Sequence, residues 1–409
     1  MDKLELLEDK YIDLVLKKCL NFAQSKSLMI HIDLREHLPF ALKIKEKAEK
    51  MGIFDIAIDL CDLYEYHDYL KNTDIKDIKE NDLLDRSKWD LYAKKGGALL
   101  FVNSEIPGLM SDIESEKQNI ATKIREKNCT YYRSHVTKYT FPWTIIAMPN
   151  LEWAKSVFPN DPDAYQKLYL KIMEMCMIPS ENPVLAWDQF ILKSNQYKEK
   201  LNDLQITELH FQNQLGTNLY VRKRADATWI NLDKMDQSGH NMIANMPSYE
   251  IFTSPDYHYT RGIVYSSKPL VFQGVIIDQF WLRFEEGKVI DYDAKIGRDA
   301  LTNLLSNYTN SCYLGEIALV ESDSPIAKTN LVFCSTLFDE NASCHFALGQ
   351  SYHLPINGSD QMTKEELEEV GLNSSPIHVD FMMGTDDMNI EAETRYGRKL
   401  IFKQGRFHL

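Results

Sequence analysis

The sequence predicts an α/β protein. Its N-terminal part should contain a mostly parallel sheet, and its C-terminal part should be a strand-rich α+β domain. The first half alternates short apolar runs with segments that are apolar at helical spacing, an order typical of a parallel sheet covered by helices. Beyond about residue 205, strand patterns and hairpins dominate. A chain of 409 residues is long for one core, so we expect two domains, residues 1–205 and 206–409.

Local patterns indicate each element of the first half. Apolar side chains cluster on one side of residues 4–23 at helical spacing, and a second helix is expected between Pro39 and Gly52. Further helices are expected at 111–127, 161–175 and 187–204. The expected strands are the apolar runs at 28–32, 53–58, 98–102 and 143–148.

The second half is expected to form antiparallel hairpins. Residues 209–211 and 218–221 are separated by a loop that contains Gly216, and residues 279–284 and 289–292 flank a glycine-containing turn. A short helix is expected at 297–305.

Composition predicts an ordinary soluble globular protein, since 44% of the residues are hydrophobic and 26% are charged. The formal charge of -14 repels polyphosphate, so nucleic acid is not an expected partner. The N-terminus has no signal-peptide pattern, and no apolar run approaches the ~20 residues of a membrane helix. Seven cysteines without a CxxC pair are typical of reduced thiols. We therefore expect a cytoplasmic protein that does not bind membranes.

Acidic and histidine residues in roughly the last 160 positions are the candidate functional residues, because several interrupt apolar stretches where a charge is costly unless it is paired. They are Glu250, Glu316, Glu340, His345, His378 and Asp380. The clearest pattern is at 376–384, where a strand would place His378 and Asp380 on one face. Because His-x-Asp is a short motif, a strand with a polar solvent face is the alternative.

Each of the other candidate residues also has an alternative interpretation in which it has no functional role. Glu340 and His345 are five residues apart, which is off the same-face spacing of a helix, so we expect a loop leading into a helix over 346–348. Glu316 lies at the mouth of an apolar strand and could instead be an exposed strand start. Glu250 lies in a strand-like segment between two prolines and could be a loop acid.

Four carboxylates and two imidazoles without cysteine suit a pair of divalent ions, Zn, Co, Mn or Mg, better than a closed structural zinc site. Other chemistries lack their motifs: the sequence has no GxGxxG after a strand, no Walker lysine motif, no HExxH and no GxSxG. The remaining histidines near strand-like runs, His31, His135 and His210, are expected to be structural.

Four stretches together resemble the thermophilic-aminopeptidase family of metallopeptidases, the aminopeptidase T, AmpS and PepS type. They are NMPSYEIFTSP at 245–255, GE at 315–316, FDENASCHFALGQSY at 338–352 and HVDFMMGT at 378–385. The resemblance implies a metal-dependent aminopeptidase with two adjacent divalent ions in its C-terminal catalytic domain. The implied ligands are Glu250, Glu316, Glu340, His345, His378 and Asp380.

The resemblance also implies roles for single residues. Glu316 is expected to bridge the ions and to take part in catalysis, and Tyr352 matches the family's catalytic tyrosine. Tyr249 replaces a residue that is commonly small, which we expect to narrow the nearby pocket. The resemblance further implies a homodimer in which the two sites face an enclosed interior.

The expected chemistry is hydrolysis of the N-terminal peptide bond by a water molecule whose pKa two ions lower from about 15.7 to roughly 7. One ion could also bind the free α-amine of the peptide, and Tyr352 could stabilise the oxyanion. The sequence leaves open whether Glu250, Glu316 or Glu340 transfers the proton. Two alternatives remain, a two-metal phosphoesterase and a non-catalytic binding protein on the same fold.

Overall fold

A computed structural model of the protein describes residues 3–21, 26–136, 138–224, 227–236, 239–273, 275–352, 356, 358 and 362–409. Contacts divide the chain into two compact units. The first comprises Met1–Gln189 and Asp233–Pro247, and the second comprises Phe190–Leu232 and Ser248–Leu409. The division falls inside helix α9 (Pro183–Asp203). The expected domain boundary at residue 205 stays a prediction.

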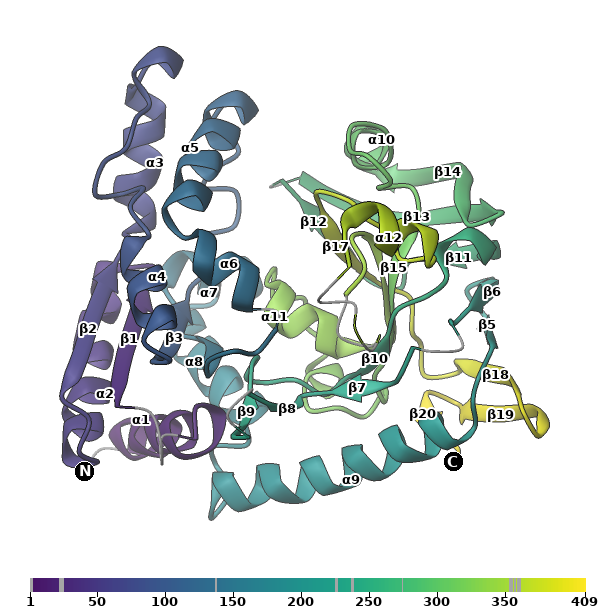
Figure 1. Ribbon diagram of the computed structural model, residues 1–409, viewed down its shortest axis with the longest axis horizontal. Helices are drawn as coiled ribbons and strands as arrows, with labels where there is room; N and C mark the ends of the chain where they lie inside the picture. Colours follow the sequence, from purple (N-terminus) through teal and green to yellow (C-terminus); the bar gives the residue numbers. More distant parts are fainter. Residues whose placement is uncertain are drawn as a thin grey trace. The chain divides into compact units, whose positions relative to one another are not determined.

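The first unit is built on a parallel sheet, as predicted. Within the described residues, four strands pair in the order β2-β1-β3-β4, and all three pairings are parallel. The inner strands β1 and β3 are buried along nearly their whole length, whereas the edge strand β2 is partly exposed. The strands are β1 (Ser27–Ile32), β2 (Asp55–Leu60), β3 (Ala98–Asn103) and β4 (Trp143–Ala147) (Figure 1).

Helices alternate with these strands, and their ends follow local chemistry. Pro39 lies in the first turn of α2, and Gly52 just beyond its end has a φ of 90°. The side chain of Asp62 caps α3 by accepting hydrogen bonds from two backbone N–H groups. The helices are α1 (Lys3–Leu14), α2 (Leu38–Lys50), α3 (Leu63–Asn72), α4 (Ser87–Lys94), α5 (Ser115–Asn128), α6 (Thr130–Val136), α7 (Leu151–Val157) and α8 (Ala164–Met175).

Two details of the first unit differ from the expected elements. The predicted helix over 4–23 is α-helical only to Leu14 and continues as a π-helical segment, Val15–Cys19, while residues 22 and 23 lie outside the described residues. A short hairpin of β8 (Asp233–Met235) and β9 (Asn241–Ile243) also belongs to this unit.

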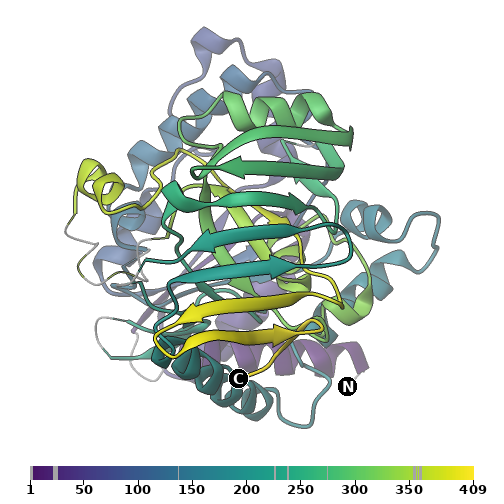
Figure 2. The ribbon, with the colours of Figure 1, turned by 90° about the vertical axis from the view of Figure 1, so that its right-hand side faces the viewer.

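The second unit contains a large antiparallel sheet, which Figure 2 shows face on. Its order among the described residues is β12-β13-β11-β6-β5-β18-β19-β20, and β14 pairs with β13. Both predicted hairpins are present, β5 with β6 and β13 with β14. The strands are β5 (Glu208–Gln212), β6 (Asn218–Arg222), β11 (Arg261–Tyr265), β12 (Leu270–Phe272), β13 (Val275–Glu285), β14 (Lys288–Ile296), β18 (Asn389–Thr394), β19 (Gly397–Lys403) and β20 (Arg406–Phe407).

A small antiparallel sheet carries the candidate functional residues. Its order in the described part of the chain is β17-β16-β15-β10-β7. Every residue of β15 and β16 is buried. The strands are β7 (Ile230–Asn231), β10 (Ile251–Thr253), β15 (Leu314–Leu319), β16 (His345–Gly349) and β17 (His378–Met382).

The helix predicted over residues 346–348 is wrong, because these residues belong to β16. A short apolar run does not distinguish a buried strand from a helix by periodicity. Here the neighbouring strands β15 and β17 provide hydrogen-bonding partners on both sides. This pairing decides the conformation, and no local signal reports it.

The core of the second unit lies between the two antiparallel sheets. Phe211 of the large sheet packs edge-on against Phe346 of the small sheet at 4.9 Å, and Phe280 lies 5.7 Å from Phe381. One face of the small sheet is therefore apolar, and its other face is free to carry polar groups. Three short helices complete the unit, α10 (Arg298–Ser306), α11 (Thr336–Asp339) and α12 (Lys364–Glu369).

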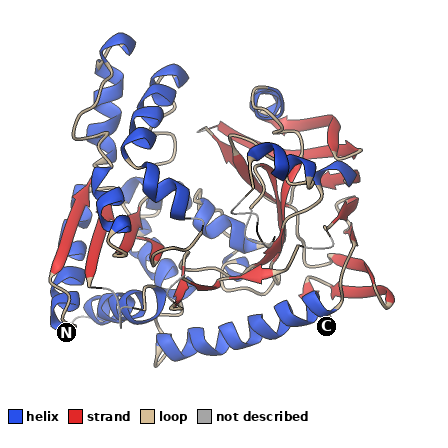
Figure 3. Ribbon diagram, viewed as in Figure 1, coloured by secondary structure: helices blue, strands red, loops and turns tan. Residues whose placement is uncertain are grey.

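Figure 3 shows the alternation of helices and strands in the first unit and the many strands of the second, which confirms the predicted fold class. The seven cysteines carry free thiols. No described helix is long and apolar enough to span a bilayer.

Candidate metal centre

Three neighbouring strands, β15, β16 and β17, present most of the predicted residues on one face of the small sheet. Ala347 of β16 lies opposite Glu316 on one side and opposite Asp380 on the other. Residues that are directly opposite in an antiparallel sheet share a face, and so do residues two apart in one strand. His345 and His378 therefore join Glu316 and Asp380 on this face.

Small residues separate these polar side chains. Ala347 lies between Glu316 and Asp380, and Gly349 lies opposite His378. A methyl group or a hydrogen atom occupies little of the space above the middle strand. The sequence therefore surrounds a region of small side chains with carboxylates and imidazoles, an arrangement that leaves room for ions.

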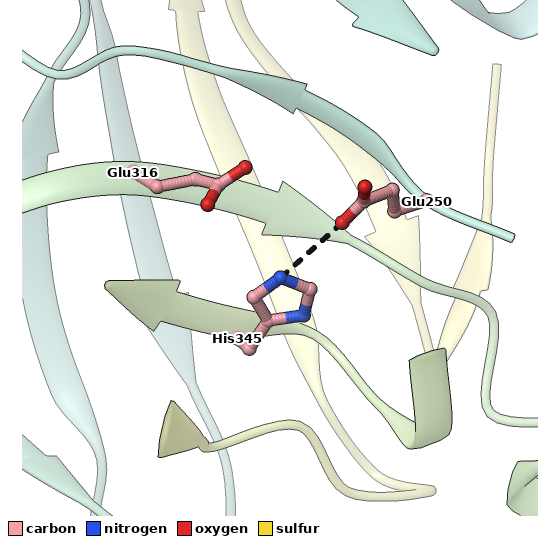
Figure 4. A group of neighbouring side chains, drawn as sticks. All are labelled: Glu250, Glu316 and His345. Atoms are coloured by element: carbon pink, nitrogen blue, oxygen red, sulfur yellow. Dashed lines mark ion pairs between the residues drawn. The ribbon is translucent and has the colours of Figure 1, made fainter. Parts of the chain in front are cut away.

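The ligand atoms form two groups that share one residue. Glu250, Glu316 and His345 each offer an atom within 4.8 Å of the others, and so do Glu316, His378 and Asp380. Figure 4 shows the first group, in which Nε2 of His345 lies 3.3 Å from a carboxylate oxygen of Glu250. Five of the six predicted ligands thus come together, and Glu316 belongs to both groups.

In the second group His378 links two carboxylates. Its Nε2 lies 3.1 Å from Oε2 of Glu316 and 3.1 Å from Oδ1 of Asp380. The predicted alternation in this strand is correct, since both side chains of the His-x-Asp pair reach the same carboxylate cluster.

Backbone carbonyls orient both imidazoles. The Nδ1–H group of His345 donates to the carbonyl of Ser343 at 3.2 Å, and that of His378 donates to the carbonyl of Gln350 at 2.7 Å. Each ring therefore directs its Nε2 atom toward the carboxylates. Histidines that bind metals in proteins usually have such a partner on the second nitrogen.

Gly315 permits the position of Glu316. The register between β15 and β16 shifts at this glycine, and a Cβ atom there would overlap with the carbonyl oxygens of Gly349 and Gln350. The close backbone approach is possible only for glycine. Glu250 is the residue immediately before β10, and its carboxylate lies near the ligand atoms of the other group members, Glu316 and His345.

Electrostatics in the centre is dominated by crowded carboxylates. Burial raises the pKa of Glu316 to about 7; the hydrogen bond and charge of His378 oppose this rise, and the charges of Glu250 and Asp380 add to it. Burial lowers the pKa of His345, but its hydrogen bond to Glu250 and the charges of Glu250, Asp380 and Glu316 raise it to about 10. Burial lowers the pKa of His378, but the charges and hydrogen bonds of Asp380 and Glu316 together raise it.

The donor set fits divalent cations. The Oδ1 atom of Asp380 is buried, and its ion-pair contact with Nε2 of His378 at 3.1 Å lacks hydrogen-bond geometry within the described chain. A buried carboxylate oxygen in this state is costly unless a cation compensates it. The charges of four carboxylates balance those of two divalent ions when both imidazoles are neutral. The group contains only oxygen and nitrogen donors, which suit metals such as zinc, cobalt or manganese.

Glu340 lies beside the two groups but belongs to neither of them. It begins the short 3₁₀ helix Glu340–Ala342, and its Oε1 accepts a hydrogen bond from Nδ2 of Asn341 at 3.3 Å. Burial raises its pKa well above the usual value, and the negative charges of Glu250 and Asp380 raise it further. The carboxylate of Glu340 is therefore close enough to those of Glu250 and Asp380 for their negative charges to repel one another.

Tyr352 extends from the segment that follows β16. Its ring centre lies 4.7 Å from that of His378, and its carbonyl accepts a hydrogen bond from Ser254 at 2.6 Å. The side chain is 38% exposed. Its pKa is nevertheless raised, first by burial around the hydroxyl group and then by the charges of Glu316 and Asp380. The hydroxyl therefore keeps its proton at neutral pH and can donate a hydrogen bond.

Comparison with known proteins identifies the family. Residues 5–407 match the family model described as thermophilic metalloprotease (M29). The chain belongs to this metalloprotease family. It is therefore a hydrolase that depends on a divalent metal, and the resemblance seen in the sequence is confirmed.

Curated relatives of this metalloprotease are aminopeptidases. It is 38% identical to aminopeptidase AmpS of Bacillus subtilis (strain 168) over 318 residues, 77% of each chain. It is 32% identical to aminopeptidase 2 of Geobacillus stearothermophilus over 100% of this chain and 99% of the relative.

Solved structures support the fold. Wild-type AmpT from Thermus thermophilus matches 99% of both chains with a TM-score of 0.87 and 27% identity. The 2,5-dihydroxypyridine dioxygenase from Pseudomonas putida KT2440 matches with a TM-score of 0.53 at 10% identity, over 99% of this chain and 96% of the other. This second likeness concerns the fold alone.

The metalloprotease also contains residues near the centre that the motifs did not single out. Ala347 lies between Glu316 and Asp380, and Asn341 contacts Glu340. Strand alternation would have placed Ala347 among the ligands had residues 346–348 been predicted as a strand. For Asn341, the only sequence signal was its position inside the motif at 338–352.

Tyr249 of the metalloprotease immediately precedes Glu250 and contacts Phe190. The residue is buried, and its ring lies edge-on against Phe190 at 5.0 Å. Its backbone N–H donates to Asn341 Oδ1 at 2.6 Å. The expected narrowing of a substrate pocket by this ring stays a prediction.

Histidines outside the cluster make other contacts. His31 forms ion-pair contacts with Asp59 at 2.9 Å and Asp33 at 3.3 Å, and the rings of His135 and His210 stack on tyrosines. None of the metal-ligand groups found among the described residues includes them.

We predict that Ala347→Val lowers the metal content of the protein, because the added methyl groups would enter the space between Glu316 and Asp380. Overpacking also costs about 1–3 kcal/mol of stability. Elemental analysis after dialysis against zinc, together with thermal unfolding, checks this. Ala392→Val is the matched control, since Ala392 is a fully buried alanine of β18 in the other sheet. A variant at Ala347 that binds as much metal as the wild type would contradict the prediction.

Proposed function

We propose that this enzyme removes N-terminal residues from peptides by means of two adjacent divalent ions. The proposed ligands are Glu250, Glu316, Glu340, His345, His378 and Asp380, with Glu316 bridging the two ions. That the protein is a metal-dependent aminopeptidase follows from its family and its relatives. The observation that supports two ions is that Glu316 belongs to both groups of possible ligands.

Charge and donor type support zinc, cobalt or manganese as the ions, with magnesium as a further candidate. Carboxylates and imidazoles bind borderline metals well, and two ligand groups that share a carboxylate suit the spacing of about 3.5–4 Å found in two-metal sites. A single ion would leave roughly half of the negative charge uncompensated.

The ions would polarise the scissile carbonyl and lower the pKa of water. The residues of the chain would orient the ligands and stabilise the oxyanion. The carbonyls of Ser343 and Gln350 hold His345 and His378 in the orientation that a ligand needs. Tyr352, which keeps its proton and lies beside His378, would donate a hydrogen bond to the developing oxyanion.

Substrates are peptides, and a free α-amine would be recognised at the centre. The crowded carboxylates favour binding of the cationic ammonium group. After the ammonium group loses a proton, its nitrogen would coordinate one of the ions. The chain's membership in a peptidase family argues against the phosphoesterase alternative. A homodimer, which the resemblance implies, and a cytoplasmic location, which composition and the cysteines suggest, stay predictions.

The first test of the function concerns chelation and the free amine. Prolonged treatment with EDTA should abolish release of free amino acids from peptides, and zinc, cobalt or manganese should restore it. Peptides with an acetylated N-terminus should be poor substrates, because acetylation removes the amine. Chromatography of the products checks both expectations, and p-nitrophenyl phosphate is the control substrate. Equal cleavage of blocked and free peptides would contradict an aminopeptidase.

We further predict that metal binding releases protons. In the metal-free protein His345, with a pKa of about 10, is protonated at pH 7, and Glu316, with a pKa of about 7, is partly protonated. Ions bind the deprotonated forms, so more than one proton per chain should be released at pH 7. The affinity should therefore fall by at least about tenfold per pH unit below pH 7. Titration calorimetry in buffers of different ionisation enthalpy measures this release, and binding without it would refute the prediction.

For Tyr352 we expect that Tyr352→Phe lowers kcat by roughly 10²–10³ with little change in KM, the cost of losing one oxyanion donor. Metal content should equal that of the wild type, since tyrosine is not among the proposed ligands. Tyr396→Phe serves as control, because Tyr396 is 60% exposed in the turn between β18 and β19. Nearly full kcat in Tyr352→Phe would remove the residue from the mechanism.

A further inference from the structure

Asn341 occupies a fully buried position directly beside Glu340. Its Oδ1 accepts the backbone N–H of Tyr249 at 2.6 Å. Its Nδ2 donates to the carbonyl of Leu337 at 3.1 Å and to Oε1 of Glu340 at 3.3 Å. Both the oxygen and the nitrogen of this side-chain amide therefore form hydrogen bonds.

These contacts join two segments that are 92 residues apart in the chain. Tyr249 immediately precedes Glu250, one proposed ligand, and Glu340 is another. A single amide thus holds one carboxylate directly and fixes the backbone from which the other extends.

We propose that Asn341 is a positioning residue, which sets Glu250 and Glu340 relative to each other and thereby determines the affinity of the centre for its divalent ions. The proposal rests on the function proposed above.

The chemistry of the amide group explains why asparagine is needed. The side chain must accept from Tyr249 and donate to a carboxylate at the same time, and an amide provides both within a short reach. Aspartate could keep the first bond but has no donor for Glu340. It would also add a negative charge to a cluster that already holds four carboxylates. Alanine would lose all three hydrogen bonds of the side chain.

The backbone around Asn341 has other supports that do not involve its side chain. The hydroxyl of Ser324 donates to the carbonyl of Asn341 at 3.0 Å. The carboxylate of Asp339 accepts the backbone N–H groups of Phe333 at 2.8 Å and Ser335 at 3.1 Å. A variant of the side chain should therefore leave the segment folded.

The experiment measures cobalt(II) binding to the metal-free full-length protein. Competition with a coloured chelator gives the affinity and the stoichiometry, and the visible absorption of bound cobalt reports the geometry of its ligands. Asn341→Ala and Asn341→Asp should each weaken binding about 10–100-fold, the usual effect of removing a partner that orients a ligand, and should change the cobalt spectrum.

Two variants separate positioning from general loss of stability. Asn231→Ala removes a fully buried asparagine of β7 whose amide donates to Ser194 at 2.8 Å and to Asn195 at 3.0 Å. Ser324→Ala removes the backbone support of Asn341 but keeps its side chain. Both should lower the melting temperature and keep the wild-type affinity and spectrum for cobalt.

Wild-type affinity and spectrum in both Asn341 variants would overturn the positioning role and leave the proposed function intact. Equal weakening in Asn231→Ala would overturn it too, since stability alone would then explain the effect. Failure of the wild-type protein to bind cobalt would instead overturn the proposed function, and the proposal with it. Because Asn341→Asp keeps the bond to Tyr249, it allows the test even if Asn341→Ala unfolds.

Discussion

Mutual repulsion among buried carboxylates on one face of the small antiparallel sheet is the constraint on which the rest of the centre depends. After burial, the negative charges of Glu250 and Asp380 raise the pKa values of both Glu316 and Glu340. Without metal ions, protons on the histidines offset part of this charge. Divalent ions can replace those protons, which makes the folded centre and its metal load interdependent.

The opposite face of the same sheet provides the rigidity that such a cluster requires. Phe346 and Phe381 pack against the large sheet, so the strands that carry His345 and Asp380 are anchored from behind. Alternation along each strand then separates an apolar face from a charged one. The fold alone does not determine the reaction, since a dioxygenase with 10% identity has a similar architecture.

Local patterns predicted much of this arrangement. The His-x-Asp alternation in β17 was correct, because a two-residue period directly reports which side chains share a face. The same reasoning failed for residues 346–348, where β16 depends on hydrogen bonds to β15 and β17. The link from Asn341 to Tyr249 could not be predicted, because it joins residues 92 positions apart.

The sequence by itself determined the class of fold, the family and the chemical types of the candidate ligands. These properties are encoded in residue identities, short motifs and the periodicity of apolar side chains. Only the tertiary structure decided that Glu316 belongs to both ligand groups, that Ala347 leaves space between Glu316 and Asp380, and that Glu340 belongs to neither group. Each of these results depends on the register between strands and on the distances in space between side chains that are far apart in the sequence. Strand pairing and packing together determine both.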